Sequence, residues 1–131
     1  MRVVIGEDEA LLRQGLALLL RQDGFDVVEV APDAVALEEA VRAHDPDLVI
    51  TDIQMPEMDG YQVLDAILKE DLPVLTIVVS GDIQPEARAR VRNLGAIEFI
   101  KKPTDTDLVS QLLRDYGFLR AEDLAKDQEH A

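Results

Sequence analysis

The chain has 131 residues, 47% of them hydrophobic, which fits a single domain with a full core. Its formal net charge of −14 repels polyanions and we see no cluster of Lys and Arg, so we do not expect nucleic acid as a partner. The chain has neither an apolar run long enough to span a bilayer nor a signal-peptide pattern, so we expect no membrane partner and predict a cytoplasmic protein. Cysteine is absent and the two histidines, His44 and His130, lie far apart, which excludes disulfides and thiol catalysis and argues against a histidine metal cluster.

The first half of the chain alternates short β-branched runs with segments of helical periodicity. Residues 2–6 form a short β-branched run that predicts a strand, and leucines at helical spacing predict a helix over 9–22. Gly24 ends that helix. Residues 27–30 predict a second strand and 33–43 a second helix.

The second half repeats this unit. A third strand is expected over 47–51, followed by a helix that Asp59 can cap, with Gln62 at the capping-box position. Further elements follow in the same order: a strand over 74–79, a helix from Pro85 to Leu94, a strand over 97–100, and a last helix opened by Thr104 and Asp107.

Five strands alternating with five helices predict an α/β fold, in which right-handed crossovers make a doubly wound parallel sheet covered on both faces. In such sheets the ligand crevice lies at the carboxyl ends of the strands. We expect one domain over 1–118. The acidic, weakly patterned residues 119–131 are expected to form a tail or a helical extension, with no room for an output domain.

Charged and polar side chains gather at these strand ends. Glu7 and Asp8 follow the first strand, Asp52 the third and Ser80 the fourth, while Lys102 follows the fifth. Each residue alone is an ordinary cap or surface charge. Together, three converging carboxylates repel one another by roughly 3 to 4 kcal/mol per pair, which a hard divalent cation such as Mg²⁺ relieves.

Asp52 is the single acid at the carboxyl end of its strand, opposite the ends that carry Ser80 and Lys102. It is therefore the natural acceptor of a phosphoryl group, because carboxylates attack phosphorus to give reactive acyl phosphates. A hydroxyl and an ammonium group are the partners that such a phosphoryl group needs.

The chain resembles the receiver domain of two-component response regulators over about residues 2–117. The resemblance rests on four motifs at strand ends: GEDE, VITDIQMPEMDG, VVSGD and FIKKP. It implies a flavodoxin-like (βα)5 fold with strand order 2-1-3-4-5, an order known for a chemotaxis receiver and taken here from the resemblance alone.

The resemblance also implies roles for individual residues. Asp52 is the expected phosphoacceptor, and Asp8, Asp52 and the carbonyl of Gln54 are expected Mg²⁺ ligands, with Glu7 binding through water. Ser80 is expected to follow the phosphoryl group and Lys102 to pair with it. The Lys102–Pro103 bond is expected to be cis, which would place the lysine in the crevice. Phe99 falls at the position of the family's switch residue, although a phenylalanine at this position could also be an ordinary core residue. Gln54 and Asp82 lie where relatives tune phosphate lifetime.

The implied function is a phosphorylation-dependent signalling switch, not an enzyme acting on other molecules. A sensor histidine kinase or phosphotransfer protein would donate the phosphate, and repacking of the helix from Pro85, the strand 97–100 and the helix from Thr104 would change the face that meets a downstream protein. The chain would be a monomer or a phosphorylation-dependent homodimer.

Three alternatives stay open. The first half resembles receivers fused to DNA-binding domains and the second half chemotaxis receivers, so a hybrid or engineered scaffold without a working partner is possible. A Mg²⁺-dependent aspartyl-phosphate hydrolase is disfavoured, because its acids follow a D-x-D pattern. An FMN site is disfavoured because Glu7, Asp8 and Glu9 would repel its phosphate.

Overall fold

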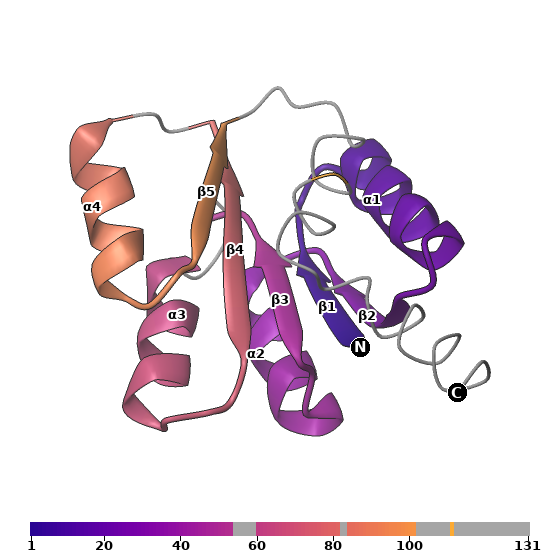
Figure 1. The fold of residues 1–131 in the computed structure, drawn as a ribbon, viewed down its shortest axis with the longest axis horizontal. Helices are drawn as coiled ribbons and strands as arrows, with labels where there is room; N and C mark the ends of the chain where they lie inside the picture. Colours follow the sequence, from indigo (N-terminus) through magenta and orange to yellow (C-terminus); the bar gives the residue numbers. More distant parts are fainter. Residues whose placement is uncertain (54–59, 82–83, 102–110, 112–131) are drawn as a thin grey trace, which may run out of the picture.

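The computed structural model describes residues 1–53, 60–81, 84–101 and 111, and within them strands and helices alternate without exception (Figure 1). The predicted last helix from Thr104 and the predicted tail 119–131 lie outside the described residues. The elements are β1 (Arg2–Gly6), α1 (Ala10–Gln22), β2 (Asp26–Ala31), α2 (Ala34–His44), β3 (Leu48–Thr51), α3 (Gly60–Lys69), β4 (Leu75–Ser80), α4 (Pro85–Asn93) and β5 (Glu98–Lys101).

The five strands form one parallel sheet in the order β2-β1-β3-β4-β5. This order confirms the predicted doubly wound α/β fold. The chain moves outward from β1 to β2 and then returns past β1 to continue on its other side. The sheet order therefore reverses between β1 and β3, and their carboxyl ends flank the place where such folds bind ligands.

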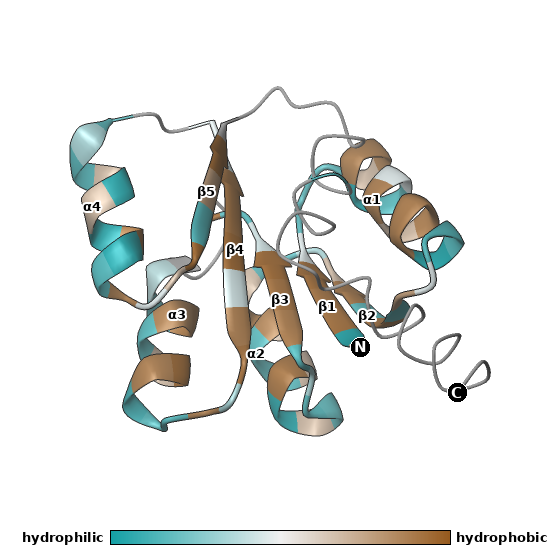
Figure 2. Ribbon diagram, in the orientation of Figure 1, coloured by the Kyte–Doolittle hydropathy of each residue, from teal (hydrophilic) through white to brown (hydrophobic). Residues whose placement is uncertain are grey.

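Alternate residues of β1 show how both faces of the sheet are covered. Val3 and Ile5 pack in one cluster with Leu16 of α1, whereas Val4 packs in another with Leu37 of α2. Side chains alternate across a strand, so α1 and α2 lie on opposite faces. Figure 2 shows the result, with apolar colour running almost continuously along the central strands, as expected for strands buried on both sides.

Strand and helix boundaries differ from the predictions by one residue or so. β4 runs over Leu75–Ser80 instead of 74–79, because the Val74 N–H donates to the Leu72 carbonyl in a turn (2.8 Å) and the ladder begins only where Leu75 N–H reaches Asp47 (3.0 Å). Ser80 is thus the last residue of the strand, paired with Lys101.

Two predicted helix starts prove to be N-caps. Asp33 precedes α2 with an extended backbone, and its carboxylate accepts a hydrogen bond from the N–H of Ala36 (2.8 Å). Glu9 precedes α1 without a side-chain cap of this kind. Among the helices of the described residues, none combines the length and the apolar composition that crossing a membrane requires.

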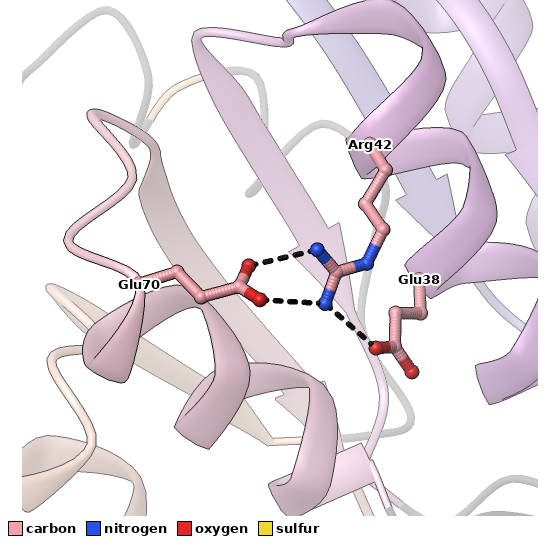
Figure 3. A network of polar contacts seen from close by, with 3 residues as sticks. All are labelled: Glu38, Arg42 and Glu70. Atoms are coloured by element: carbon pink, nitrogen blue, oxygen red, sulfur yellow. Dashed lines mark hydrogen bonds and ion pairs between the residues drawn. The ribbon is translucent and has the colours of Figure 1, made fainter.

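An exposed ion-pair network ties α2 to the end of α3 (Figure 3). The Arg42 guanidinium donates to both carboxylate oxygens of Glu70 at 2.9 Å and to Glu38, one turn earlier on α2, at 3.1 Å. The hydrogen bonds that Arg42 donates to Glu70, and to a lesser extent to Glu38, raise the pKa of Arg42 above its ordinary value. The two-pronged contact fixes the relative position of the two helix ends more firmly than a single bond would.

Candidate functional site

The carboxyl ends of β1 and β3 bring three acids together. Glu7, Asp8 and Asp52 each offer one oxygen, and these oxygens all lie within 4.8 Å of one another. Glu7 is 1% exposed and Asp52 3% exposed, whereas Asp8 faces solvent. The cluster therefore has a buried floor of two carboxylates and an accessible third.

The sheet ladder fixes the backbone beneath these acids. Gly6 pairs with Thr51 at the end of β1 and β3, and the ladder continues as the Asp52 N–H donates to the Gly6 carbonyl at 3.0 Å. On the other side, the Glu7 N–H donates to Ala31 of β2 at 2.9 Å. Strand pairing thus holds the backbone of both buried acids.

Gly6 makes this close approach possible. A Cβ placed on Gly6 would lie 2.6 Å from Thr51 Oγ1 and 2.8 Å from Leu37 Cδ2. Thr51 Oγ1 in turn donates to the carbonyl of Asp52 at 2.8 Å. The absence of a side chain at position 6 therefore allows the packing that fixes the acceptor strand.

Arg13, a residue that the sequence did not mark as functional, orders the acidic turn. One guanidinium nitrogen donates to the Glu7 carbonyl at 2.8 Å and lies 3.4 Å from the Asp8 carbonyl. Within the turn, the Glu9 N–H donates to a carboxylate oxygen of Glu7 at 3.1 Å. A guanidinium group on α1, the helix that follows the acids, thus contacts the backbone of the acidic turn.

Electrostatics favour a divalent cation at this cluster. At 4.8 Å and an effective dielectric of about 20, two carboxylates repel by roughly 3.5 kcal/mol, although other polar contacts of Glu7 and Asp52 offset part of this. Carboxylate oxygens are the ligands preferred by Mg²⁺, which also keeps several waters. Two buried acids and one exposed acid fit such a partly hydrated ion.

Ser80 ends β4, the strand next to β3, and is fully buried. It therefore lies at the same edge of the sheet as Asp52. Its register partner is Lys101 of β5, directly before Lys102 in the chain. The remaining predicted site residues, Gln54, Asp82 and the Lys102–Pro103 pair, lie outside the described residues.

Phe99 is half-buried on β5, paired in register with Val78 of β4. It packs against a cluster that includes Ile53, the residue after Asp52. The guanidinium of Arg88 on α4 lies 4.9 Å from the centre of its ring. Phe99 thus contacts both α4 and the cluster that includes Ile53, and its role as a switch stays a prediction.

Comparisons with known proteins agree with this geometry. The model of the response regulator receiver domain family matches residues 3–114. The transcriptional regulatory protein PdtaR of Mycobacterium tuberculosis is 37% identical over 102 residues, which are 78% of this chain and 49% of PdtaR. A protein-glutamate methylesterase/protein-glutamine glutaminase of Pseudomonas aeruginosa is 37% identical over 77% of this chain and 30% of its own length.

A solved structure shows the same likeness in three dimensions. The signal receiver domain of NarL from Mycobacterium tuberculosis superposes with a TM-score of 0.80 at 33% identity, covering 87% of this chain and 93% of that domain. The chain spans about half of the length of PdtaR and full-length NarL. The similarity therefore concerns the part of those proteins that this chain matches.

Proposed function

The chain belongs to the response regulator receiver domain family, whose members act as phosphorylation-dependent switches in two-component systems, and we propose that Asp52 is its phosphoacceptor. The observation that carries the proposal is the position of Asp52: a buried carboxylate at the end of β3, within 4.8 Å of two other acids. Such a charge cluster is costly for stability alone and useful for phosphoryl transfer.

The proposed transfer has a simple balance. A carboxylate oxygen of Asp52 forms a bond to phosphorus while the bond from phosphorus to the imidazole nitrogen of a donor phosphohistidine breaks, and the released histidine takes up a proton. A sensor histidine kinase or a phosphotransfer protein would supply that donor. The chain would catalyse only its own phosphorylation and dephosphorylation.

Glu7, Asp8, Asp52 and the carbonyl of Gln54 would hold the Mg²⁺ ion. Bound there, the ion would supply positive charge for the oxygens of the arriving phosphoryl group. Ser80 would follow the phosphoryl group with its hydroxyl, because it lies buried at the same sheet edge. Lys102 would provide the second cation.

Phosphorylation would then shift a population between two states of the chain. We propose that Phe99 changes its packing as Ser80 is drawn towards the phosphate, and that the face of α4, β5 and the helix predicted from Thr104 meets a downstream protein. The switch would comprise residues 1–118 with 119–131 as a tail, work in the cytoplasm, and exist as a monomer or a phosphorylation-dependent homodimer.

Intact-mass measurement with acetyl phosphate and Mg²⁺ tests the acceptor. Wild type should gain the mass of one phosphoryl group, and Asp52→Asn should not. Asp47→Asn is the matched control, because Asp47 immediately precedes β3 at the far end of the same strand, where its carboxylate accepts from the Arg2 N–H. An undiminished adduct on Asp52→Asn would exclude Asp52 as the acceptor.

A further inference from the structure

Helix α4 concentrates positive charge on an acidic protein. It carries Arg88, Arg90 and Arg92 in nine residues, all exposed, although the chain has only 13 basic residues and a net charge of −14. The sequence showed no cluster of basic residues, because the arginines alternate with other residues and come together only on the helix. Figure 2 shows α4 as hydrophilic over most of its length.

Two of these arginines line a groove between α4 and β5. Arg88 and Arg92 lie one turn apart and border a cavity of about 120 Å³, whose opposite wall is formed by residues 96–99. Typical small-molecule sites measure roughly 300 to 1,000 Å³. The groove is smaller than this range and can hold individual side chains of a protein partner.

Arg90 lies on the other flank of the helix. Its guanidinium stacks over the ring of Tyr61 on α3, 3.8 Å from the ring centre, and it does not line the groove. The same helix thus offers two arginines inside the groove and one outside it. Because all three side chains carry the same charge, comparing substitutions of Arg90 with those of Arg88 and Arg92 separates binding in the groove from the overall charge of the helix.

Within the described part of the chain, Glu98 is the one acidic residue that lines the groove. Its carboxylate accepts a hydrogen bond from the Phe99 N–H at 3.2 Å, which directs one oxygen to its own strand. Glu86, in the first turn of α4, is a second acid nearby in the chain but not part of the lining. Among the lining residues that the structure describes, two guanidinium groups stand against one carboxylate, so this part of the lining is positively charged.

We propose that this groove binds an acidic segment of the downstream protein, with carboxylates of that segment paired to Arg88 and Arg92. The inference rests on the proposed function and specifies the chemistry of its partner. Guanidinium groups match carboxylates with two parallel hydrogen bonds. At physiological ionic strength charges act over about 8 Å, so the local arginines outweigh the distant acids for a short segment, whereas a long polyanion such as DNA meets the whole negative charge.

The contact between Arg88 and Phe99 couples this groove to the switch. A guanidinium 4.9 Å from the ring centre is held there by cation–π attraction, which competes with a carboxylate of the partner. Movement of Phe99 on phosphorylation would release Arg88. The affinity of the groove for an acidic segment would then be higher in the phosphorylated chain.

Selection from a random 12-residue peptide library displayed on phage tests the partner chemistry without a known partner. Wild type, phosphorylated with acetyl phosphate and Mg²⁺, should enrich peptides rich in Asp and Glu, and synthetic copies should shift the NMR signals of α4 and β5. Arg88→Gln with Arg92→Gln should weaken these peptides at least about tenfold, as expected for two lost charge-assisted contacts. Arg90→Gln should change the affinity less than about twofold.

Three results with the peptides would each overturn the inference: enrichment of neutral or basic peptides, no enrichment at all, or an equal loss in Arg90→Gln. Tighter binding of a DNA duplex than of the acidic peptides would also overturn it. The adduct on Asp52 is measured by intact mass in the same variants. Normal phosphorylation without acidic peptide binding refutes the groove alone, whereas absence of the adduct in wild type refutes the proposed function itself.

Discussion

At position 6, a single methyl group decides whether β1 and β3 can keep their spacing at the acidic cluster. We expect Gly6→Ala to destabilise the protein by about 1–3 kcal/mol, because the new Cβ would lie 2.6 Å from Thr51 Oγ1 and 2.8 Å from Leu37 Cδ2. Urea unfolding followed by circular dichroism measures the change. A free energy of unfolding equal to that of wild type would show that Thr51 and Leu37 move aside easily.

Arg13 is expected to position the acidic turn for the metal. Arg13→Gln should remove the hydrogen bond to the Glu7 carbonyl and the longer contact with the Asp8 carbonyl, and let the acidic turn move. Mg²⁺ binding should then weaken about three- to tenfold, as the loss of one charge-assisted bond implies. Titration calorimetry measures the affinity directly, and Arg13→Lys should restore part of it.

Arg21 provides the matched control for Arg13. It lies on the same helix and also donates a guanidinium hydrogen bond to a backbone carbonyl, that of Val27 at 3.2 Å, in a segment apart from the acids. Arg21→Gln should lower stability without changing Mg²⁺ affinity. Equal losses of affinity in both variants would point to a general weakening of α1 and exclude a specific role for Arg13.

The carboxylate of Asp52 should lower the stability of the folded protein when no metal is bound. Asp52→Asn removes its repulsion with Glu7 and Asp8, so we expect the melting temperature in EDTA to rise by roughly 3–10 °C, corresponding to about 1–3 kcal/mol. Saturating Mg²⁺ at about a hundred times its dissociation constant should stabilise wild type by about 2.7 kcal/mol. A variant that gains as much from Mg²⁺ as wild type would contradict a shared carboxylate site.

At the scale of elements, α2 and α3 are joined by the Arg42 network as well as by their apolar faces. Arg42→Gln should lower the melting temperature by less than Gly6→Ala does, because the pairs are exposed, and the difference from wild type should shrink as NaCl increases. Differential scanning calorimetry at several salt concentrations measures it.

The pH dependence of this network follows from the direction of the pKa shift. Because Glu70 and Glu38 raise the pKa of Arg42, its contribution is complete below the unfolded-state pKa and is lost only as the pH rises through the still higher folded-state value. The difference between wild type and Arg42→Gln should therefore stay constant between about pH 6 and 9. A difference that falls within this range would mean that a group other than Arg42 controls the network.

For the whole molecule, the sequence predicted the fold well because each level of pattern agreed with the others. The apolar runs of β1, β3 and β4 are buried on both faces, as expected for strands whose sequence is continuously apolar and does not alternate between apolar and polar residues. The strand order itself could not be derived from these runs. It came from resemblance to a family, and the hydrogen-bonded pairs of the sheet confirm it.

The gathering of Glu7, Asp8 and Asp52 was also predictable, because parallel strands present their carboxyl ends at one edge. The supporting contacts were not. Arg13 reaches the acids through the geometry of a helix start, and Gly6 matters through a distance to Leu37 on another element. Such contacts depend on side-chain positions in three dimensions, for which the spacing of residues in the chain gives no clear sign.

The small buried stripe of α4 has a consequence for local unfolding. Only Ala87 and Val91 of this helix are buried, whereas α1 buries Leu16, Ala17 and Leu20 and α2 buries four residues. Less apolar area holds α4 to the sheet, so it should open more often than its neighbours.

Amide hydrogens of α4 should therefore exchange with deuterium at least about tenfold faster than those of α1 and α2, as a difference of roughly 1.4 kcal/mol in opening free energy implies. Hydrogen exchange read by mass spectrometry measures this, and equal protection of the three helices would contradict it. The helix that carries the arginine groove is then also the one whose folding a bound partner could most readily stabilise.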